Sequence, residues 1–198
     1  TDHPSLCSRS PQQAMSETAP VTVGIPTHGR GERIFKPLEQ ILASSPPPAE
    51  IIVHIDAGDR ALERRIAERY PSVRLLLSSN RIGPGGGRHR CLLAATQLYF
   101  ASFDDDSWPL DADYFKCVAT HFERSPDVAV LAANVVQRGQ TPSPSSPATE
   151  MVVGYTGCGH AMRVGAYRGI PGYVDRPLAY GLEERDVARA LRELRLDP

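Results

Sequence analysis

The stretch VTVGIPTHGRGERIFKPLEQILASSPPPAEIIVHID, residues 21–56, decides the fold. It begins and ends with short runs rich in β-branched residues, VTVGIP (21–26) and EIIVHID (50–56), which predict two buried strands. Between them, apolar side chains recur at helical spacing over residues 33–43, and Pro37 is compatible with a helix only near its first turn. A strand, a helix and a second strand in this order predict a β-α-β unit with parallel strands.

The same alternation continues toward the C-terminus. Further elements are predicted at short intervals, namely strands at 73–78, 99–103 and 128–136, and helices at 60–69, after the glycines of 83–87, at 111–123 and at 182–196. Strands that alternate with helices favour an α/β fold with a Rossmann-like, mostly parallel central sheet flanked by helices. A chain of 198 residues, of which 41% are hydrophobic, is long enough for one sizeable domain.

Two segments have the composition of irregular chain. Residues 1–20 are rich in Ser, Pro and Gln without periodicity and predict a flexible leader, so the folded domain is expected to span 21–198. Segment 138–150 has the composition of a long loop, which in a compact domain is often functional. The predicted last helix carries arginines on one side, which indicates a solvated face more strongly than a membrane or partner surface.

Charge and cysteine content restrict the class of partner and the compartment. The 22 Lys and Arg residues against 23 Asp and Glu residues give a formal net charge of −1, so no overall field attracts nucleic acid. The four cysteines form no C-x-x-C motif, which argues against a zinc knuckle and favours a reduced protein. No apolar run reaches the ~18 residues of a membrane span. We therefore expect a cytoplasmic protein, with peripheral attachment to the inner face of the membrane as an alternative.

Polar side chains follow each of the first four predicted strands. In an open parallel sheet, ligands bind beyond the carboxyl ends of the strands. The segments at these positions are Pro26-Thr27-His28-Gly29-Arg30, Asp56-Ala57-Gly58-Asp59, residues 80–88 (NRIGPGGGR) and Asp104-Asp105-Asp106. Three consecutive carboxylates repel one another, and a bound Mg²⁺ or Mn²⁺ is the simplest compensation. A solvated turn explains such a run equally well.

The glycine-rich run from Gly83 to Gly87, followed by Arg88, permits close approach of the backbone to a ligand. The helix that follows it would offer free N–H groups to an anion. The run lacks the G-K-[ST] ending of a P-loop and follows the third strand, not the first, so it is no Rossmann fingerprint either. A flexible connector is an equally good interpretation.

Acids and histidines supply candidate proton-transfer groups. Glu183 and Glu184 open the last predicted helix, where the helix dipole favours acids, and a carboxylate there can also act as a general base. His28 and His160 lie in glycine-flanked loops and could contact a ligand. His54 lies within a strand and is expected to be a packed core residue. No histidine is assigned a catalytic role.

Taken in order, these segments resemble the family 2 glycosyltransferases with the GT-A fold, from Val21 to about Leu194. The segments that carry the resemblance are VTVGIPTHGR (21–30), IDAGD (55–59), NRIGPGGGRHR (80–90), FDDDSWPLDADYF (103–115), GCGHAMRVGAYRGIPGY (157–173) and LEERDVA (182–188). Each motif is weak alone, but their order is specific. The resemblance implies a nucleotide-sugar-binding half, 21–107, and an acceptor-side half, 108–198.

The resemblance also implies roles for individual residues. Nucleotide-sugar binding falls to Pro26, Thr27, Arg30, Asp56, Gly83, Arg88, Asp104 and Asp105. Within this set the family pattern puts Asp56 at the nucleobase, Arg88 beside the nucleotide and Asp105 near the ribose. Asp104 and Asp106 match the D-x-D pair, with Asp106 the direct ligand of Mg²⁺ or Mn²⁺. Glu184 matches the base, with its neighbour Glu183 as the other candidate.

The activity that the resemblance implies is metal-dependent, inverting transfer of a sugar from a nucleoside-diphosphate sugar to an acceptor hydroxyl on a saccharide, lipid or small molecule. One alternative is a sugar-phosphate nucleotidyltransferase of related fold. Another is a non-catalytic domain that binds a sugar nucleotide. The nucleobase, the sugar, the acceptor and a homo-oligomeric state stay open at this point.

Overall fold

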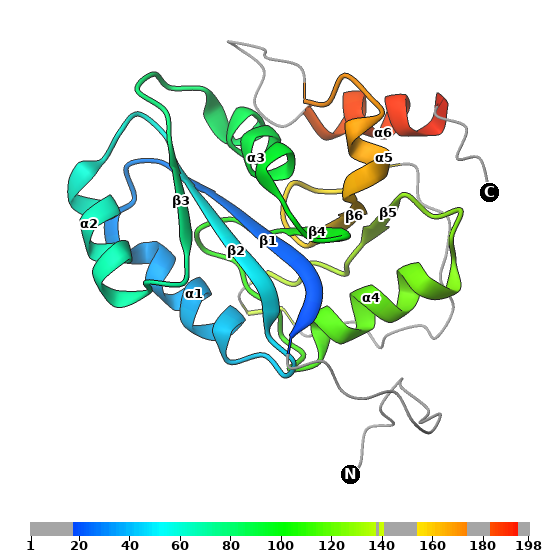
Figure 1. The fold of residues 1–198 in the computed structure, drawn as a ribbon, viewed down its shortest axis with the longest axis horizontal. Helices are drawn as coiled ribbons and strands as arrows, with labels where there is room; N and C mark the ends of the chain where they lie inside the picture. Colours follow the sequence, from blue (N-terminus) through cyan, green and yellow to red (C-terminus); the bar gives the residue numbers. More distant parts are fainter. Residues whose placement is uncertain (1–17, 138, 141–153, 174–182, 194–198) are drawn as a thin grey trace.

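The computed structural model describes residues 18–137, 139–140, 154–173 and 183–193, which form a six-stranded sheet between helices (Figure 1). The strands are β1 (Ala19–Thr27), β2 (Pro48–Ile55), β3 (Arg74–Leu77), β4 (Tyr99–Ser102), β5 (Val130–Ala132) and β6 (His160–Arg163). The helices are the 3₁₀ turn η1 (Gly31–Ile34), α1 (Phe35–Leu42), α2 (Arg60–Arg69), α3 (Gly83–Ala94), α4 (Tyr114–Arg124), α5 (Val164–Arg168) and α6 (Glu183–Glu193). None of the described helices is long and apolar enough to cross a membrane.

The sheet is mostly parallel, as predicted. Its order is β3-β2-β1-β4-β6-β5. The three pairings among β3, β2, β1 and β4 are parallel, and β6 pairs antiparallel with both β4 and β5. β1 begins at Ala19, which is buried and pairs with Pro48, so the first strand starts two residues before the expected Val21. Residues 1–17 of the expected leader lie outside the described residues.

Side chains that alternate along the strands divide the core between the two faces of the sheet. Val21, Val23 and Ile25 of β1 face a core closed by α1, α2 and α4. Ile52 and Phe100, on the opposite face of β2 and β4, pack with α3, α5 and α6. These helices lie on opposite sides of the sheet in Figure 1. Burial of each aliphatic side chain contributes about 1.5–3 kcal/mol to the free energy of folding. The cores on both faces of the sheet therefore hold the strand ends in place.

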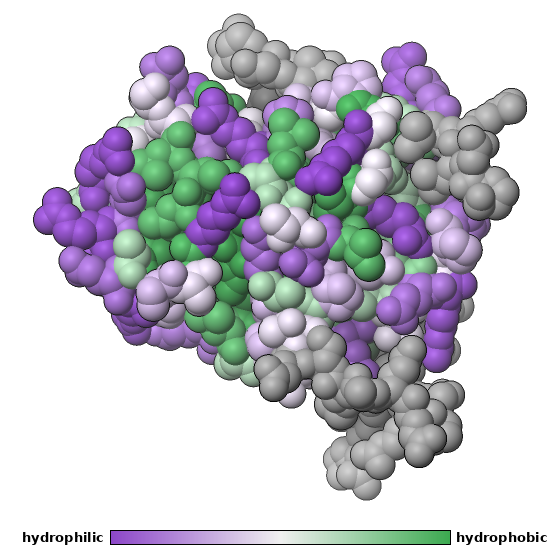
Figure 2. Space-filling view, viewed as in Figure 1, coloured by the Kyte–Doolittle hydropathy of each residue, from purple (hydrophilic) through white to green (hydrophobic). Residues whose placement is uncertain are grey.

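The edge strand β3 is only partly covered. Leu75, Leu76 and Leu77 are half-buried, and Figure 2 shows hydrophobic residues gathered over this edge of the sheet. Arg90 of α3 reaches the edge and donates a hydrogen bond to the carbonyl of Leu77 at 3.4 Å. A short edge strand with a neighbouring cation is less exposed to pairing with another chain.

The glycine run lies inside α3, which corrects the expectation of a loop followed by a helix. α3 begins at Gly83, and Pro84 occupies its first turn, where the missing N–H has no cost. Gly87 lets the helix approach the sheet: a Cβ there would lie 2.8 Å from Pro26 Cβ and 2.9 Å from His54 Nδ1. Packing against β1 and β2 thus stabilises a helical conformation that a glycine-rich sequence disfavours by itself.

Replacing Gly87 by alanine is expected to lower the free energy of unfolding by about 1–3 kcal/mol, because the methyl group must displace backbone-anchored neighbours. Urea unfolding followed by circular dichroism measures this loss. Gly165→Ala is the matched control, since a Cβ at that position in α5 meets nothing within 4 Å. The control should be neutral or slightly stabilising. Equal stability of the two variants would contradict the close-packing role of Gly87.

One other predicted element differs from the structure. The strand expected at 128–136 covers only Val130–Ala132, because β5 is an edge strand and residues 132–135 are exposed. The elements β6 and α5 were not predicted, since neither has a clear apolar period. α6 is described over Glu183–Glu193, so the ends of the helix expected at 182–196 lie outside the described residues. Of the expected loop 138–150, only residues 139–140 are described.

Candidate functional site

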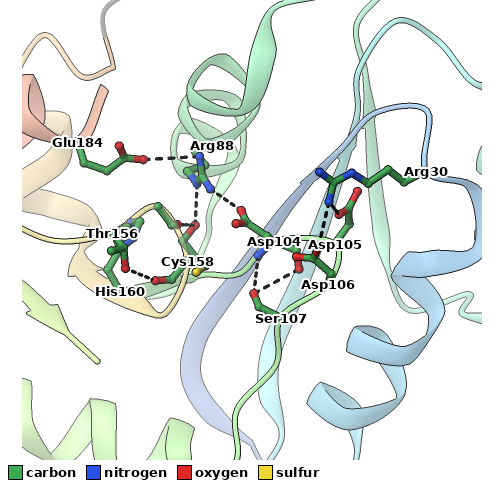
Figure 3. A network of polar contacts seen from close by, with 12 residues as sticks. Arg30, Arg88, Asp104, Asp105, Asp106, Ser107, Thr156, Cys158, His160 and Glu184 are labelled. Carbon is green, nitrogen blue, oxygen red and sulfur yellow. Dashed lines mark hydrogen bonds and ion pairs between the residues drawn. The ribbon is translucent and has the colours of Figure 1, made fainter. Parts of the chain in front are cut away.

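Three consecutive acids, residues 104–106, begin two residues after the end of β4, and two of them contact residues at and just beyond the end of β1 (Figure 3). Thr27 Oγ1 donates a hydrogen bond to Asp105 Oδ2 at 2.8 Å. Arg30 Nη1 donates to Asp105 Oδ1 and Asp106 Oδ2, each at 3.0 Å. Because β1 and β4 are parallel neighbours, their carboxyl ends adjoin, which is why these residues lie together.

The carboxyl groups of Asp105 and Asp106 differ in their surroundings. Burial raises the pKa of Asp105, the Thr27 and Arg30 contacts lower it, and the charge of Asp106 raises it again, so the net pKa lies above its ordinary value. The Asp106 side chain is 40% exposed, and Arg33 Nη1 lies 3.8 Å from its Oδ2. Asp105 therefore serves as an internal anchor of the loop, whereas Asp106 faces the surface.

The guanidinium of Arg88 forms a second cluster on the other side of the acids. Arg88 projects from α3 and is only 4% exposed. Its Nε donates to Ser102 Oγ at 3.1 Å, its Nη2 donates to Asp104 Oδ1, and its Nη1 lies 3.6 Å from Glu184 Oε1 (Figure 3). Burial opposes the charge, but Asp104, Tyr173 and Glu184 raise the pKa of Arg88 above its ordinary value. The side chain therefore remains a cation at the junction of β4, α3 and α6.

Two residues of this cluster were not singled out from the sequence. Ser102 Oγ donates to the carbonyl of Gly157 at 2.9 Å, while it accepts from Arg88. A Cβ on Gly157 would lie 2.6 Å from Arg88 Nη2 and 2.7 Å from Glu184 Oε1. The G-x-G spacing at 157–159 marked the segment as a whole, but the contact with Arg88 depends on the pairing of β6 with β4.

Asp56 lies at the end of β2 and holds the start of α3. Its carboxylate accepts from the backbone N–H groups of Ala57, Ile82 and Gly83 and from the Ser78 hydroxyl at 2.8 Å. Burial raises the pKa of Asp56, but the Ile82, Ser78 and Gly83 hydrogen bonds outweigh it and leave the pKa below its usual value. The nucleobase contact expected for Asp56 stays a prediction. A bound nucleobase would donate to a carboxylate that already accepts several hydrogen bonds from the protein.

The remaining candidates have separate positions. Pro26 lies in β1 against Gly87 of α3, and Gly83 donates its N–H to Asp56. Glu183 is the first residue of α6, and its side chain lies outside the described part of the structure. The structure thus brings together two groups that meet at the loop after β4, one built on Arg30 and one built on Arg88.

The acids after β4 have the donor chemistry that Mg²⁺ or Mn²⁺ requires. Carboxylate oxygens are hard ligands, and the side chains of Asp104 and Asp106 are 37% and 40% exposed. Among the described residues, no group of three or more His, Cys, Asp or Glu side chains is arranged to hold a metal ion. An ion here would therefore take one or two carboxylates and complete its shell with water and substrate oxygens, as Mg²⁺ commonly does.

The three histidines singled out from the sequence lie in different surroundings. His160 was expected in a loop with access to ligand, but it lies in β6 with no exposed surface, which corrects that expectation. Its Nδ1–H donates to the carbonyl of Thr156 at 2.8 Å. His28 is exposed, with its Nδ1 3.2 Å from the Asp56 carbonyl. His54 is fully buried in β2, as predicted for a core residue.

Burial lowers the pKa of His160 from 6.5 to about 3, and the charge of Arg88 lowers it further. The neutral form therefore stabilises the fold, and this contribution is complete above pH 6.5 and is lost as the pH falls toward 3. We expect the free energy of unfolding to fall by about 1.4 kcal/mol per pH unit through this group below pH 6.

Urea unfolding at several pH values between 4.5 and 7.5 measures this dependence. His160→Asn is the matched variant, because its amide nitrogen can still donate to Thr156. The variant should show the flatter curve, while His54 and His89, whose pKa values are also lowered by burial, contribute equally to both proteins. Parallel curves for the two proteins would contradict the assignment to His160.

The fold matches solved structures of other proteins over most of the chain. The mannosyltransferase PcManGT from Pyrobaculum calidifontis, in complex with GDP-Man and Mn²⁺, superimposes with a TM-score of 0.65 at 19% identity, over 88% of this chain and 52% of that chain. TarS 1–349 from S. aureus gives a TM-score of 0.68 at 16% identity, over 86% of this chain and 54% of that chain. The same TarS segment in complex with UDP-GlcNAc gives a TM-score of 0.66 at 16% identity, over 86% of this chain and 52% of that chain.

These matches define an α/β fold of the GT-A type. The family model of glycosyl transferase family 2 matches residues 22–170, and the chain belongs to that family. The chain spans about half the length of the solved structures that it matches. No curated protein sequence is a significant match.

Proposed function

We propose that this protein is a metal-dependent, inverting glycosyltransferase that moves a sugar from a nucleoside-diphosphate sugar to an acceptor hydroxyl. The observation that carries the proposal is that Asp106 pairs with Arg30 while Asp104 and Glu184 pair with Arg88, on the two sides of the loop after β4. The family match supports a glycosyltransferase, and similar structures were solved in complex with GDP-Man and Mn²⁺ and with UDP-GlcNAc.

The donor diphosphate belongs beside the loop after β4. Asp106 and Asp104 would hold the Mg²⁺ or Mn²⁺, whose positive charge offsets the charge that develops on the departing diphosphate. Arg30 keeps Asp105 and Asp106 in place, and Thr27 fixes Asp105 from the other side. Asp105 would lie near the ribose, while Asp56 and the start of α3 at Gly83 would border the nucleobase.

The acceptor belongs on the side of α6. Glu184 is 8% exposed, and its Oε1 lies 3.6 Å from the Arg88 guanidinium. Its carboxylate would accept the proton of the acceptor hydroxyl while the hydroxyl oxygen attacks C1 of the sugar. The bond from C1 to the diphosphate breaks on the opposite face, so the configuration at C1 is inverted. Glu183, the neighbouring acid, is the other candidate for this role.

Calorimetric titration with UDP, GDP, CDP, ADP and dTDP, each with and without Mn²⁺, tests the donor side of the proposal. We expect one diphosphate to bind, and to bind more tightly when Mn²⁺ is present. The corresponding nucleotide sugar should then release its diphosphate in the presence of an acceptor. Binding of none of the five, with or without Mn²⁺, would contradict the proposal. Release of pyrophosphate from a nucleoside triphosphate and a sugar phosphate would instead identify a nucleotidyltransferase.

A further inference from the structure

The buried cation of Arg88 links the donor side of the site with the acceptor side. Its three guanidinium nitrogens contact three different parts of the chain: Ser102 in β4, Asp104 in the loop that follows, and Glu184 in α6. The residue is only 4% exposed. A side chain so covered offers little surface to a donor, although the resemblance to the family led us to expect Arg88 beside the nucleotide.

We propose that Arg88 is a positioning residue that fixes the Glu184 carboxylate in place relative to Asp104. The inference deepens the proposed function, since it rests on Glu184 being the base. Arg88 acts through the two carboxylates and does not itself touch the reacting atoms. In this arrangement Glu184, which receives the proton, and Asp104, which faces the donor, both contact the planar guanidinium of Arg88.

The geometry favours arginine at this position over any other residue. A planar guanidinium presents its N–H groups in a fixed fork, so it can bind a hydroxyl and two carboxylates that lie in different directions. A lysine would bring one nitrogen to the same space. Ser102 is itself held, because its hydroxyl donates to the Gly157 carbonyl. The guanidinium is thereby anchored to the sheet before it contacts either acid.

Glycine at residue 157 leaves room for the contact between Arg88 and Glu184. A Cβ on Gly157 would lie 2.6 Å from Arg88 Nη2 and 2.7 Å from Glu184 Oε1. Both partners therefore occupy the volume that any other residue would fill. Gly157→Ala keeps both charges and yet forces the pair apart, so it tests position separately from charge.

Thermal unfolding of four proteins tests whether Arg88 and Glu184 are coupled: the wild type, Arg88→Gln, Glu184→Gln and the double variant. We expect Arg88→Gln to lower Tm, because it leaves a carboxylate of low exposure without its cation. The double variant should have a Tm at or above that of Arg88→Gln, because Glu184 then no longer needs a cation. Additive losses in Tm would overturn the proposal.

Turnover separates a positioning role from a merely structural one. The readout is release of UDP from UDP-N-acetylglucosamine and of GDP from GDP-mannose. Arg88→Gln and Gly157→Ala are expected to lower kcat at least tenfold with KM for the donor changed less than threefold. Arg88→Lys should recover part of the Tm but not kcat. The double variant should be no slower than Glu184→Gln alone, because Arg88 acts through Glu184.

Arg163→Gln is the matched control for a structural arginine. Arg163 donates to the carbonyls of Phe122, Ser125 and Val128, which lie at the end of α4 and before β5. This variant should lower Tm and leave kcat unchanged. If Arg88→Gln behaves like it, Arg88 has only a structural role. If Glu184→Gln keeps normal kcat, the proposed base is wrong, whereas the Tm cycle still decides whether Arg88 holds Glu184.

Discussion

Replacing Asp106 by alanine is expected to abolish the Mn²⁺-dependent part of nucleoside-diphosphate binding and to lower turnover roughly 10³-fold. Asp106 is the more exposed of the two candidate ligands, and its Oδ2 lies between the guanidinium groups of Arg30 and Arg33. Without this carboxylate the two cations remain, so weak binding of a diphosphate in the absence of metal should persist. Calorimetric titration with and without Mn²⁺ measures both components.

The control for this substitution is Asp127→Ala, which removes an exposed carboxylate from the turn between α4 and β5. It should bind diphosphate and Mn²⁺ as the wild type does. Near-normal turnover of Asp106→Ala at saturating Mn²⁺ would show that the ion, if needed, is held elsewhere. Loss of binding in the Asp127 variant as well would mean that the effect is not specific to the loop after β4.

Replacing Glu184 by glutamine is expected to leave donor binding intact and to lower kcat about 10²–10⁴-fold, the range of a lost general base. The amide fills the same volume but cannot accept the proton of the acceptor hydroxyl at neutral pH. Calorimetry reports donor binding, and release of nucleoside diphosphate reports turnover. The two measurements together separate the loss of a base from the loss of the donor site.

Glu183→Gln is the control that the chain itself offers, because the neighbouring acid begins the same helix. It should retain kcat within a fewfold of the wild type. The opposite result, in which Glu183→Gln binds donor without turnover and Glu184→Gln is active, would assign the base to Glu183. The contact between Arg88 and Glu184 would then stabilise the fold without contributing to catalysis.

The first half of the fold could be predicted because its elements carry their own signals. The run from β1 to β2 shows buried apolar strands, a helix of regular period and a tolerated Pro37, all of which are local properties. β6 could not be predicted in the same way. Its four residues include His160 and Arg163, and their burial depends on pairing with β4, which lies far away in the sequence.

The candidate site divides in the same manner. The rule that ligands gather at the carboxyl ends of parallel strands located Asp56 and the acids 104–106. Ser102 and Gly157 have no such signal, because one is an inward residue of a strand and the other precedes an antiparallel strand. Intrinsic propensity disfavours a helix at the glycines of 83–87 and predicts a loop there, and packing of Gly87 against Pro26 overrides this preference.

The position of β4 inside the sheet has a consequence for the motion of the site. Its four residues are all buried, and they pair with Val21–Gly24 of β1 on one side and with His160–Arg163 of β6 on the other. Exposure of each of these amides to solvent requires a neighbouring strand to separate from β4. Their hydrogen exchange should therefore be among the slowest in the protein and follow global unfolding. The acids that follow β4 thus extend from a buried strand that is held on both sides, which restricts their fluctuation.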